Sequence, residues 1–250
     1  MNKVDLITWS QHQQDLFAYI MVVTDSFLTK PATKKFLDIG CRRIVDNNTY
    51  KLERLGWKGL LFDIDNAHVQ FNNTYRESKA FCVDVTTDDF CRVFLDNPEY
   101  LDVDYITIDV DEAGLGALEN LFKIGVRFKC ITFEHDSCSF GDDIKVPSVK
   151  MFRDQGYELL FEDVGIVGPE WGRPWLEWGE TPAPLEDWWI DPSFFNKDIM
   201  GFASIGELHF SIIEKLVKHL VKDGAEVENN GNVNAVLAVP SSAYKYKVRI

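Results

Sequence analysis

Residues 36–43 of the chain read FLDIGCRR, and this stretch decides the fold that we expect. The apolar residues around Asp38 are typical of a buried strand, and Gly40 after them is typical of a tight turn. In an open α/β sheet, ligands bind outside the carboxyl ends of the strands, which is where Asp38 would lie. Because glycine has no side chain, the backbone at Gly40 can approach a bound molecule closely. We therefore expect Asp38, Gly40 and Cys41 to bind a nucleoside-containing cofactor.

The composition is that of a globular protein with an acidic surface. With 250 residues, the chain is long enough for one large α/β domain or for a domain with a cap, and either can bury a sizeable core. Its contents of 46% hydrophobic and 26% charged residues are ordinary for a soluble protein. The formal net charge of −14 is unusually acidic. Because such a surface repels a phosphate backbone, we expect no long nucleic acid as a substrate.

No feature of the sequence indicates export or insertion into a membrane. The first ten residues lack the order of charged, apolar and small residues that a signal peptide has. No apolar run approaches the roughly 18 residues that a membrane-spanning helix needs. The five cysteines are odd in number and lack CxxC spacing, which favours reduced core thiols over disulfides or a zinc site. We therefore expect a cytoplasmic protein without a membrane span, and no feature indicates its oligomeric state.

Strand-like segments recur along the first two thirds of the chain. Six of them are rich in apolar residues, and they are residues 36–40, 59–65, 80–85, 104–110, 128–134 and 157–164. Apolar residues at helical spacing indicate helices between most of these segments. This alternation predicts right-handed crossovers between parallel strands. The expected fold class is therefore α/β, with a doubly wound, mostly parallel, Rossmann-like sheet, helices on both faces and a Trp-rich C-terminal insert.

The chain divides into four segments that we expect to form one compact domain. An N-terminal helical segment covers residues 1–33, and the cofactor-binding core covers residues 34–164. Residues 165–200 are an insert rich in tryptophan and proline, which we expect to be rich in loops and to lie on the substrate side. A C-terminal helix and tail occupy residues 201–250.

The insert contains five of the seven tryptophans. Aromatic faces stack on sugar rings, nucleobases or methyl-bearing cations, and the same rings can also pack a small core of their own. We expect Trp188 and Trp189 to be core residues, and Trp171, Trp175 and Trp178 to line a substrate site.

An acid follows each of the first three strands of the predicted core. Asp63 or Asp65 could accept hydrogen bonds from both hydroxyls of a ribose, because a carboxylate can accept two at once. Asp84, with Val85 beside it, could accept from the amino group of an adenine. The alternative is that these acids cap the helices that follow, each for about 1 kcal/mol. The second and third glycines of the dinucleotide fingerprint are missing after Gly40, which disfavours NAD and FAD and favours a cofactor without a pyrophosphate.

A second group of polar residues follows the fourth and fifth strands. His135 is the candidate general base, because histidine is the side chain that changes its charge near neutral pH. Asp109 or Glu134 could orient the imidazole or hold the substrate. A divalent metal on Asp109, Asp111 and Glu134 is a second interpretation, since clustered carboxylates suit magnesium or calcium. Helix capping and a structural histidine are a third.

These motifs, in this order, resemble the FkbM family of S-adenosylmethionine-dependent methyltransferases. The resemblance covers roughly residues 34–192 and rests on four stretches: DIGC at 38–41, GLLFDID at 59–65, IDVDE at 108–112 and EH at 134–135. The resemblance implies a class I Rossmann-like fold, S-adenosylmethionine as cofactor, and methyl transfer to an oxygen of a small or carbohydrate-type acceptor. It also implies that Asp38, Gly40, Asp63 and Asp84 hold the cofactor.

The chain departs from the family pattern in the turn after the first strand. Arg42 and Ile44 stand where the family tends to have a small polar residue and a glycine, and Glu112 replaces a glycine after the fourth strand. Arg42 or Arg43 could instead pair with the methionine carboxylate of the cofactor, a charge-assisted bond that arginine makes well.

Two classes of function follow from the sequence. The first is the methyltransferase. The second is a non-catalytic Rossmann-like binding module that contacts a protein or a glycan through the Trp-rich insert and the C-terminal helix, and the altered turn at Arg42 favours it.

Overall fold

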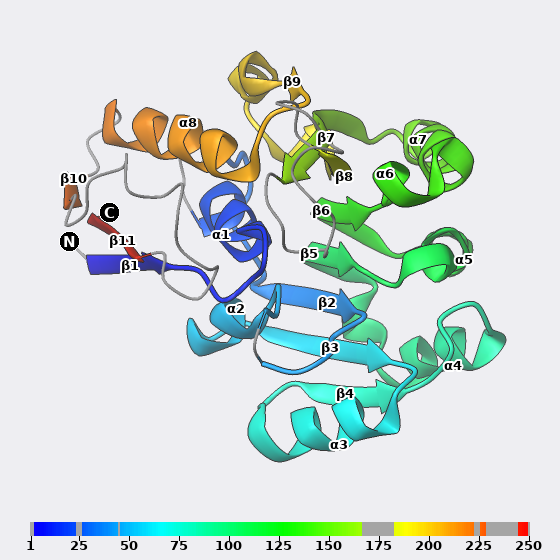
Figure 1. Ribbon diagram of the computed structural model, residues 1–250. Coiled ribbons are helices and arrows are strands. Elements are labelled where there is room, and N and C mark those ends of the chain that lie inside the picture. The colour runs from blue at the N-terminus through cyan, green and yellow to red at the C-terminus, as the bar shows by residue number, and fades with distance from the viewer. Residues whose placement is uncertain are drawn as a thin grey trace.

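The computed structural model of the chain describes residues 3–23, 27–44, 46–166, 183–222, 226–228 and 245–249 (Figure 1). The predicted substrate-site tryptophans Trp171, Trp175 and Trp178 lie outside the described residues.

The centre of the molecule is an eight-stranded sheet with the strand order β4-β3-β2-β5-β6-β8-β7-β9 (Figure 1). Its strands are β2 (Lys35–Ile39), β3 (Lys58–Asp63), β4 (Lys79–Cys82), β5 (Asp102–Ile108), β6 (Arg127–Glu134), β7 (Glu158–Ile166), β8 (Ala183–Ile190) and β9 (Ser204–Ile205). Strand β8 is antiparallel to both β6 and β7, and the other neighbouring pairs are parallel. The predicted α/β fold class with a mostly parallel sheet is confirmed.

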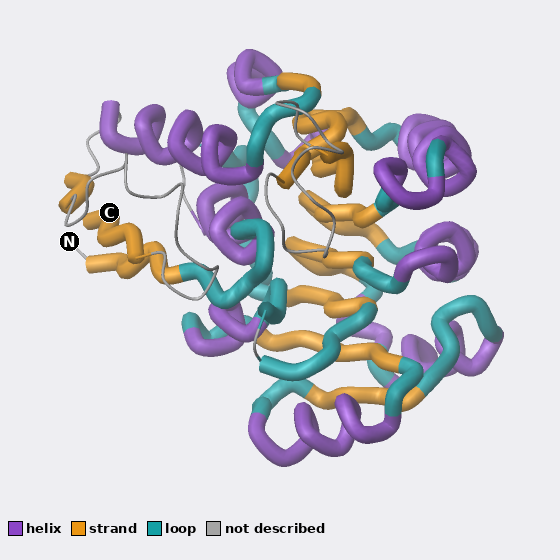
Figure 2. Tube along the Cα trace, viewed as in Figure 1, coloured by secondary structure: helices purple, strands orange, loops and turns teal. Residues whose placement is uncertain are grey.

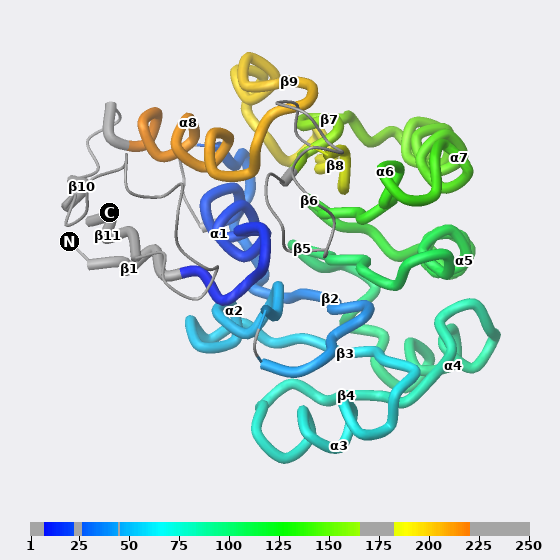
Figure 3. Tube along the Cα trace, viewed as in Figure 1, coloured from blue at the N-terminus to red at the C-terminus, as the bar shows by residue number. Residues whose placement is uncertain are grey.

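Helices cover both faces of this sheet (Figure 2). The described α-helices are α1 (Gln14–Val23), α2 (Tyr50–Arg54), α3 (Asn66–Tyr75), α4 (Asp88–Asp96), α5 (Gly114–Lys123), α6 (Ser137–Phe140), α7 (Asp142–Asp154) and α8 (His209–Lys222). Buried residues of α1, α2, α3 and α8 belong to one core cluster, and those of α4, α5 and α7 belong to another. Helices α1 and α8 lie side by side on their face (Figure 3).

Strand β2 shows why the sequence folds in this way. Successive side chains of a strand point to opposite faces, and both faces of this sheet are covered. Phe36 accordingly packs in the cluster under α1, and Leu37 packs in the cluster under α5. A continuous apolar strand is what a sheet buried on both faces requires.

The structure differs from our expectation for residues 165–200, which contain a full strand of the sheet. Strand β8 runs between β6 and β7, and its Trp188 and Trp189 are both fully buried, as expected for core residues. Trp188 packs on Phe17 of α1, with ring centroids 4.5 Å apart, and Trp189 stacks on Phe152 of α7 at 4.6 Å. The two adjacent rings thus fill the two opposite cores. Strand β8 contains Pro184, Glu186 and Asp187. Because proline and buried acids are unusual inside a sheet, the sequence pattern did not predict this strand.

A second, three-stranded sheet joins segments from the two ends of the chain: β1 (Lys3–Ile7), β11 (Lys245–Arg249) and β10 (Glu226–Glu228). None of the described helices is long and apolar enough to cross a membrane. All five cysteines are free, but only Cys41 and Cys130 are the buried core thiols that we expected, since Cys82 is exposed and Cys91 and Cys138 are half-buried.

Candidate active site

The order in which successive strands join the sheet reverses at β2. The candidate acids Asp38, Asp63, Asp84, Asp109 and Glu134 lie at or just after the carboxyl ends of β2, β3, β4, β5 and β6. From β2 the chain continues outward to β3 and β4, and then returns to form β5 on the other side of β2. Ligands of open α/β sheets bind at this kind of switch point.

Gly40 is required by the contact between the ends of β2 and β5. Its φ of +91° is one that side-chain-bearing residues rarely adopt, and a Cβ at this position would lie 1.8 Å from the carbonyl oxygen of Asp109. The Asp109 amide donates to the Ile39 carbonyl at 2.9 Å. The glycine therefore admits the neighbouring strand, whereas the sequence suggested that it would admit a ligand.

Asp38 is buried, and protein groups surround its carboxylate. It accepts hydrogen bonds from the hydroxyl of Thr49 and from Nδ2 of Asn47 at 3.1 Å, and Nη1 of Arg76 lies 3.5 Å away. Burial raises the pKa of Asp38, and Arg76, Thr49 and Asn47 oppose that rise. In this arrangement Asp38 holds the segment before α2 against the sheet.

Asp63 lies beside the turn that follows β2. Its carboxylate accepts the amide N–H of Arg42 at 2.9 Å and that of Asp65 at 2.8 Å, and it contacts Nδ1 of His68 at 3.1 Å. Cys41 in the same turn is fully buried, while Arg42 is exposed. Asp65 caps α3 by accepting the amide of Ala67. Of the two candidate ribose acceptors, Asp63 is therefore the one that faces the turn.

Asp84 and Val85 have different environments at the end of β4. Asp84 is exposed and accepts the amide and the hydroxyl of Thr86 at 2.9 and 2.7 Å, and these hydrogen bonds lower the pKa of Asp84. Val85 is buried in the core cluster under α5. An exposed carboxylate in a fixed turn remains free to accept a further hydrogen bond.

Asp109 and Glu134, which end adjacent strands, bring their carboxyl groups into hydrogen-bonding contact. Burial raises the pKa of both groups, and the neighbouring negative charge raises that of Glu134 well above its ordinary value. Burial also raises the pKa of Asp136, which hydrogen-bonds with Glu134. Because like charges in contact cannot both ionise easily, the ionised form of one carboxyl group favours the protonated form of the other. Arg42 attracts the Asp109 carboxylate from the β2 side.

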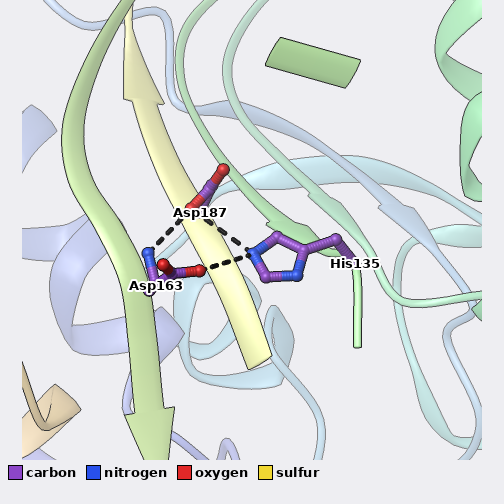
Figure 4. A group of neighbouring side chains, drawn as sticks. All are labelled: His135, Asp163 and Asp187. Atoms are coloured by element: carbon purple, nitrogen blue, oxygen red, sulfur yellow. Dashed lines mark hydrogen bonds and ion pairs between the residues drawn. The ribbon is translucent and has the colours of Figure 1, made fainter. Parts of the chain in front are cut away.

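His135 follows β6, is buried, and points toward Asp187 of β8 and Asp163 of β7 (Figure 4). Its Nδ1 accepts the amide N–H of Ser137 at 3.1 Å, so the proton of the neutral ring is on Nε2. Nε2 faces Oδ1 of Asp187 at 3.4 Å and Oδ1 of Asp163 at 3.7 Å. The geometry is that of a structural histidine oriented by two carboxylates, and it does not bring the ring to Asp109.

In the part of the chain that the structure describes, one group of three has the spacing of metal ligands, and it consists of His135, Asp163 and Asp187. A metal would need the lone pair of His135 Nε2, which carries the proton while Nδ1 accepts from Ser137. Lys145 Nζ already supplies a cation 2.7 Å from Asp163. The predicted metal set of Asp109, Asp111 and Glu134 is not such a group, since Asp111 is exposed outside the pair.

Sequence reasoning missed Glu186, which pairs in register with Glu134 across β6 and β8. Glu186 is buried, and its burial raises its pKa to about 8. Gln14 Nε2 donates to its carboxyl group at 3.4 Å. Two acids inside the otherwise apolar run APLEDWWI were the available signal.

No protein-family model matches the chain, and no curated protein matches it. The FkbM resemblance therefore stays a prediction.

Several solved structures resemble the fold. A TehB-like SAM-dependent methyltransferase from Corynebacterium glutamicum is 16% identical with a TM-score of 0.42, and the match covers 70% of this chain and 86% of that one. A putative rRNA methylase from Clostridium thermocellum is 12% identical with a TM-score of 0.45, covering 72% and 95%. A SAM-dependent methyltransferase from Archaeoglobus fulgidus is 13% identical with a TM-score of 0.41, covering 73% and 94%. At these values, the likenesses do not by themselves assign an activity to this chain.

Proposed function

We propose that the chain is an S-adenosylmethionine-dependent methyltransferase. The observation that carries the proposal is the set of carboxylates at the switch point, with Asp63 on one side and the Asp109–Glu134 pair on the other. A sulfonium cofactor with a ribose suits this set, because opposite charge lowers the energy of buried carboxylates. A pyrophosphate-bearing dinucleotide would bring negative charge to the same place, and the turn lacks the glycines to hold it.

The residues near the switch point suggest how the cofactor is held. Asp63 accepts from the ribose hydroxyls with the lone pairs that its present partners leave, since a carboxylate has about four acceptor positions. Asp84 and Val85 contact the adenine at the end of β4, and Cys41 belongs to the turn that follows β2. Arg42, which is exposed beside Asp109, pairs with the carboxylate of the cofactor.

Bound there, the cofactor supplies an electrophilic methyl group on its sulfonium. An acceptor hydroxyl placed in line with that methyl forms the new C–O bond as the C–S bond breaks and its electron pair stays on sulfur. The positive charge of the bound sulfonium would favour the ionised form of the Asp109–Glu134 pair, and Glu134 in that form takes the hydroxyl proton, because its raised pKa makes its carboxylate a stronger base than an ordinary one. This assignment replaces His135 as the base. An oxygen acceptor of small or carbohydrate type, and an acceptor wall formed by Trp171, Trp175 and Trp178, are retained from the sequence.

A non-catalytic module is the second candidate, and one observation favours it. Asp38 and Gly40, the centre of the predicted cofactor motif, are fully engaged with protein groups. A module with this fold could keep that packing without any cofactor.

Ligand-dependent stability distinguishes the two candidates. S-adenosylhomocysteine should raise the melting temperature of the full chain and NAD should not, since a ligand that binds only the folded state stabilises it. Asp63→Asn should weaken binding about tenfold, the cost of impaired hydrogen bonds to the ligand. Asp65→Asn is the matched control, because asparagine also caps helices well. A chain that responds to neither S-adenosylmethionine nor S-adenosylhomocysteine is not a methyltransferase.

The identity of the base is tested by methyl transfer from labelled cofactor into fractionated cell extract. Glu134→Gln should lower the rate by a factor on the order of 100 or more and leave binding of S-adenosylhomocysteine intact. His135→Gln should change the rate much less in protein that remains folded. The reverse order of the two variants would return the role to His135.

A further inference from the structure

Glu186 is a buried acid that lies directly opposite the proposed base and takes no part in the chemistry above. It is the partner of Glu134 in the antiparallel register of β6 and β8. Directly opposite residues of such a pair project from the same face of the sheet, with Cβ atoms about 4.5–5.5 Å apart. This face is the one that α1 covers, because Trp188, two residues further along β8, packs on Phe17. Glu186 therefore adds a further acid to the Asp109–Glu134 pair.

Neutral side chains hold the Glu186 carboxyl group in this position. Gln14 at the start of α1 donates to it through Nε2 at 3.4 Å, and Trp188 forms a second side-chain hydrogen bond with it. The amide of His12 donates to Gln14 Oε1 at 2.9 Å and so fixes that donor. Glu186 is only 2% exposed, so the solvent screens its charge little. A negative charge on either Glu134 or Glu186 therefore acts strongly on the other.

Acids from three segments raise the pKa of Glu134. Burial has the largest effect, and the negative charges of Asp109 after β5, Asp136 after β6 and Glu186 on β8 add to it. Burial likewise raises the pKa of Glu186 to about 8, although its two hydrogen bonds oppose the rise. The other titratable groups near these acids are Asp63, Asp111, Asp187, Arg42 and His135. Glu134 therefore keeps its proton at pH values at which an ordinary glutamate has lost it.

The proposed cofactor and its product differ in the charge that they bring to these acids. S-adenosylmethionine carries a sulfonium, whereas S-adenosylhomocysteine carries a neutral thioether in the same place and is otherwise alike. A positive charge within a few ångströms favours the ionised form of a carboxyl group. Binding of the sulfonium should therefore drive a proton from Glu134 into the solvent, and binding of the thioether should not.

On the premise of the methyltransferase function above, we propose that Glu186 is a positioning residue that keeps Glu134 protonated in the empty site, so that the basic carboxylate forms when the charged cofactor binds. The proton of Glu134 passes to the solvent on binding. During methyl transfer the sulfonium becomes a neutral thioether, and the acceptor hydroxyl gives its proton to Glu134, so the charge of the site is unchanged. The base is thus available only together with the methyl donor.

Proton release on binding tests the proposal in the full chain. Calorimetric titration in two buffers that differ in ionisation enthalpy gives the number of protons released, and the two ligands are compared at a series of pH values around neutrality. At its maximum, S-adenosylmethionine should release about one proton more than S-adenosylhomocysteine. Equal release at every pH, with both ligands bound, overturns the proposal.

The role of Glu186 is tested by a variant of nearly the same shape. Glu186→Gln keeps an oxygen that accepts from Gln14 and Trp188 but has no charge. Glu134 should then ionise more easily in the empty site, and the pH of maximal extra release should fall by about one unit or more. Glu158→Gln removes the same charge from an exposed position of β7 and should leave that pH unchanged. An unchanged maximum in Glu186→Gln overturns the role of Glu186.

Two further variants complete the test. Glu134→Gln should abolish the extra release, and release that persists in it would show that another group supplies the proton, which overturns the proposal. If Glu186→Gln does not fold, Glu186→Met replaces the acid by an apolar side chain of similar length and should shift the maximum in the same direction.

The two proposals fail in different ways. If both ligands bind and release the same number of protons, the role of Glu186 is wrong and the methyltransferase proposal stands. If neither ligand binds, both proposals are wrong.

Discussion

At the scale of single residues, burial decides which acid can change protonation near neutral pH. Asp84 and Glu186 both follow an apolar residue, but Asp84 is exposed after β4 and held by Thr86, whereas Glu186 is buried within β8 beside other acids. The same chemical group therefore ionises easily in one place and with difficulty in the other, because burial penalises its charged form.

Glu186 should make the protein less stable as the pH rises. Its pKa is raised from 4.5 to about 8, so the folded state retains a proton that the unfolded state releases between these values. The stability present below pH 4.5 is then lost as the pH approaches about 8. Urea unfolding of the wild type and Glu186→Gln should diverge over this range by a few kcal/mol.

Subtracting the unfolding free energy of Glu186→Gln from that of the wild type at each pH cancels the contributions of the other titrating groups, which the two proteins share. Parallel pH profiles for the wild type and Glu186→Gln would contradict the assigned burial of this carboxyl group.

At the scale of elements, one buried acid fixes where β2 begins. Asp104 of β5 accepts the amides of Thr33, Lys34 and Lys35 and pairs with Lys129 of β6 at 2.5 Å. It thus ties three neighbouring strands together at the ends opposite to the proposed site. A shift of β2 by one residue would break these bonds and also exchange the faces of Phe36 and Leu37.

Replacing Asp104 should destabilise the fold strongly. Asp104→Ala leaves Lys129 buried without its partner, and breaking a buried pair in this way costs about 3–5 kcal/mol. The loss is measured by urea unfolding. Lys150→Met breaks an exposed ion pair with Asp154 on α7 and should leave the urea midpoint unchanged. Equal midpoints for both variants would show that the Asp104 bonds do not anchor β2.

At the scale of the whole molecule, the sheet couples two separate cores. Strands β2, β5, β6 and β8 each contribute buried side chains to the cluster under α1 and to the cluster under α5. Neither core can come apart without disturbing the strands that line the other. We therefore expect the core segments and the helices on both faces to unfold as one unit.

Substitutions on opposite faces test this coupling. Leu216→Ala on α8 and Leu118→Ala on α5 each remove a fully buried side chain and should each cost about 2–5 kcal/mol. Each variant should show one urea transition, with far-ultraviolet circular dichroism and tryptophan fluorescence coinciding. Two separate transitions in either variant would mean that the faces are independent units.

The sequence predicted the strands from Phe36 to Glu134 because each is an apolar run that ends near an acid and a turn residue. It did not predict β8, where Pro184, Glu186 and Asp187 interrupt the apolar pattern. It placed Asp109 and Glu134 together, because adjacent parallel strands end at one edge. It could not tell which way His135 points, since that depends on Ser137 and on two carboxylates from distant strands.

By itself, FLDIGCRR determined a buried strand and a turn, because its apolar residues and glycine leave the backbone few alternatives. The strand acids that follow it indicated the edge of the sheet at which we propose the site. Only the tertiary structure decided what each polar residue does there. Gly40 admits Asp109, Asp38 is held by Arg76, and Asp63 is left facing the turn. The reason is physical: the strand order follows from local pattern, whereas burial and hydrogen-bond partners depend on residues that are far apart in the chain.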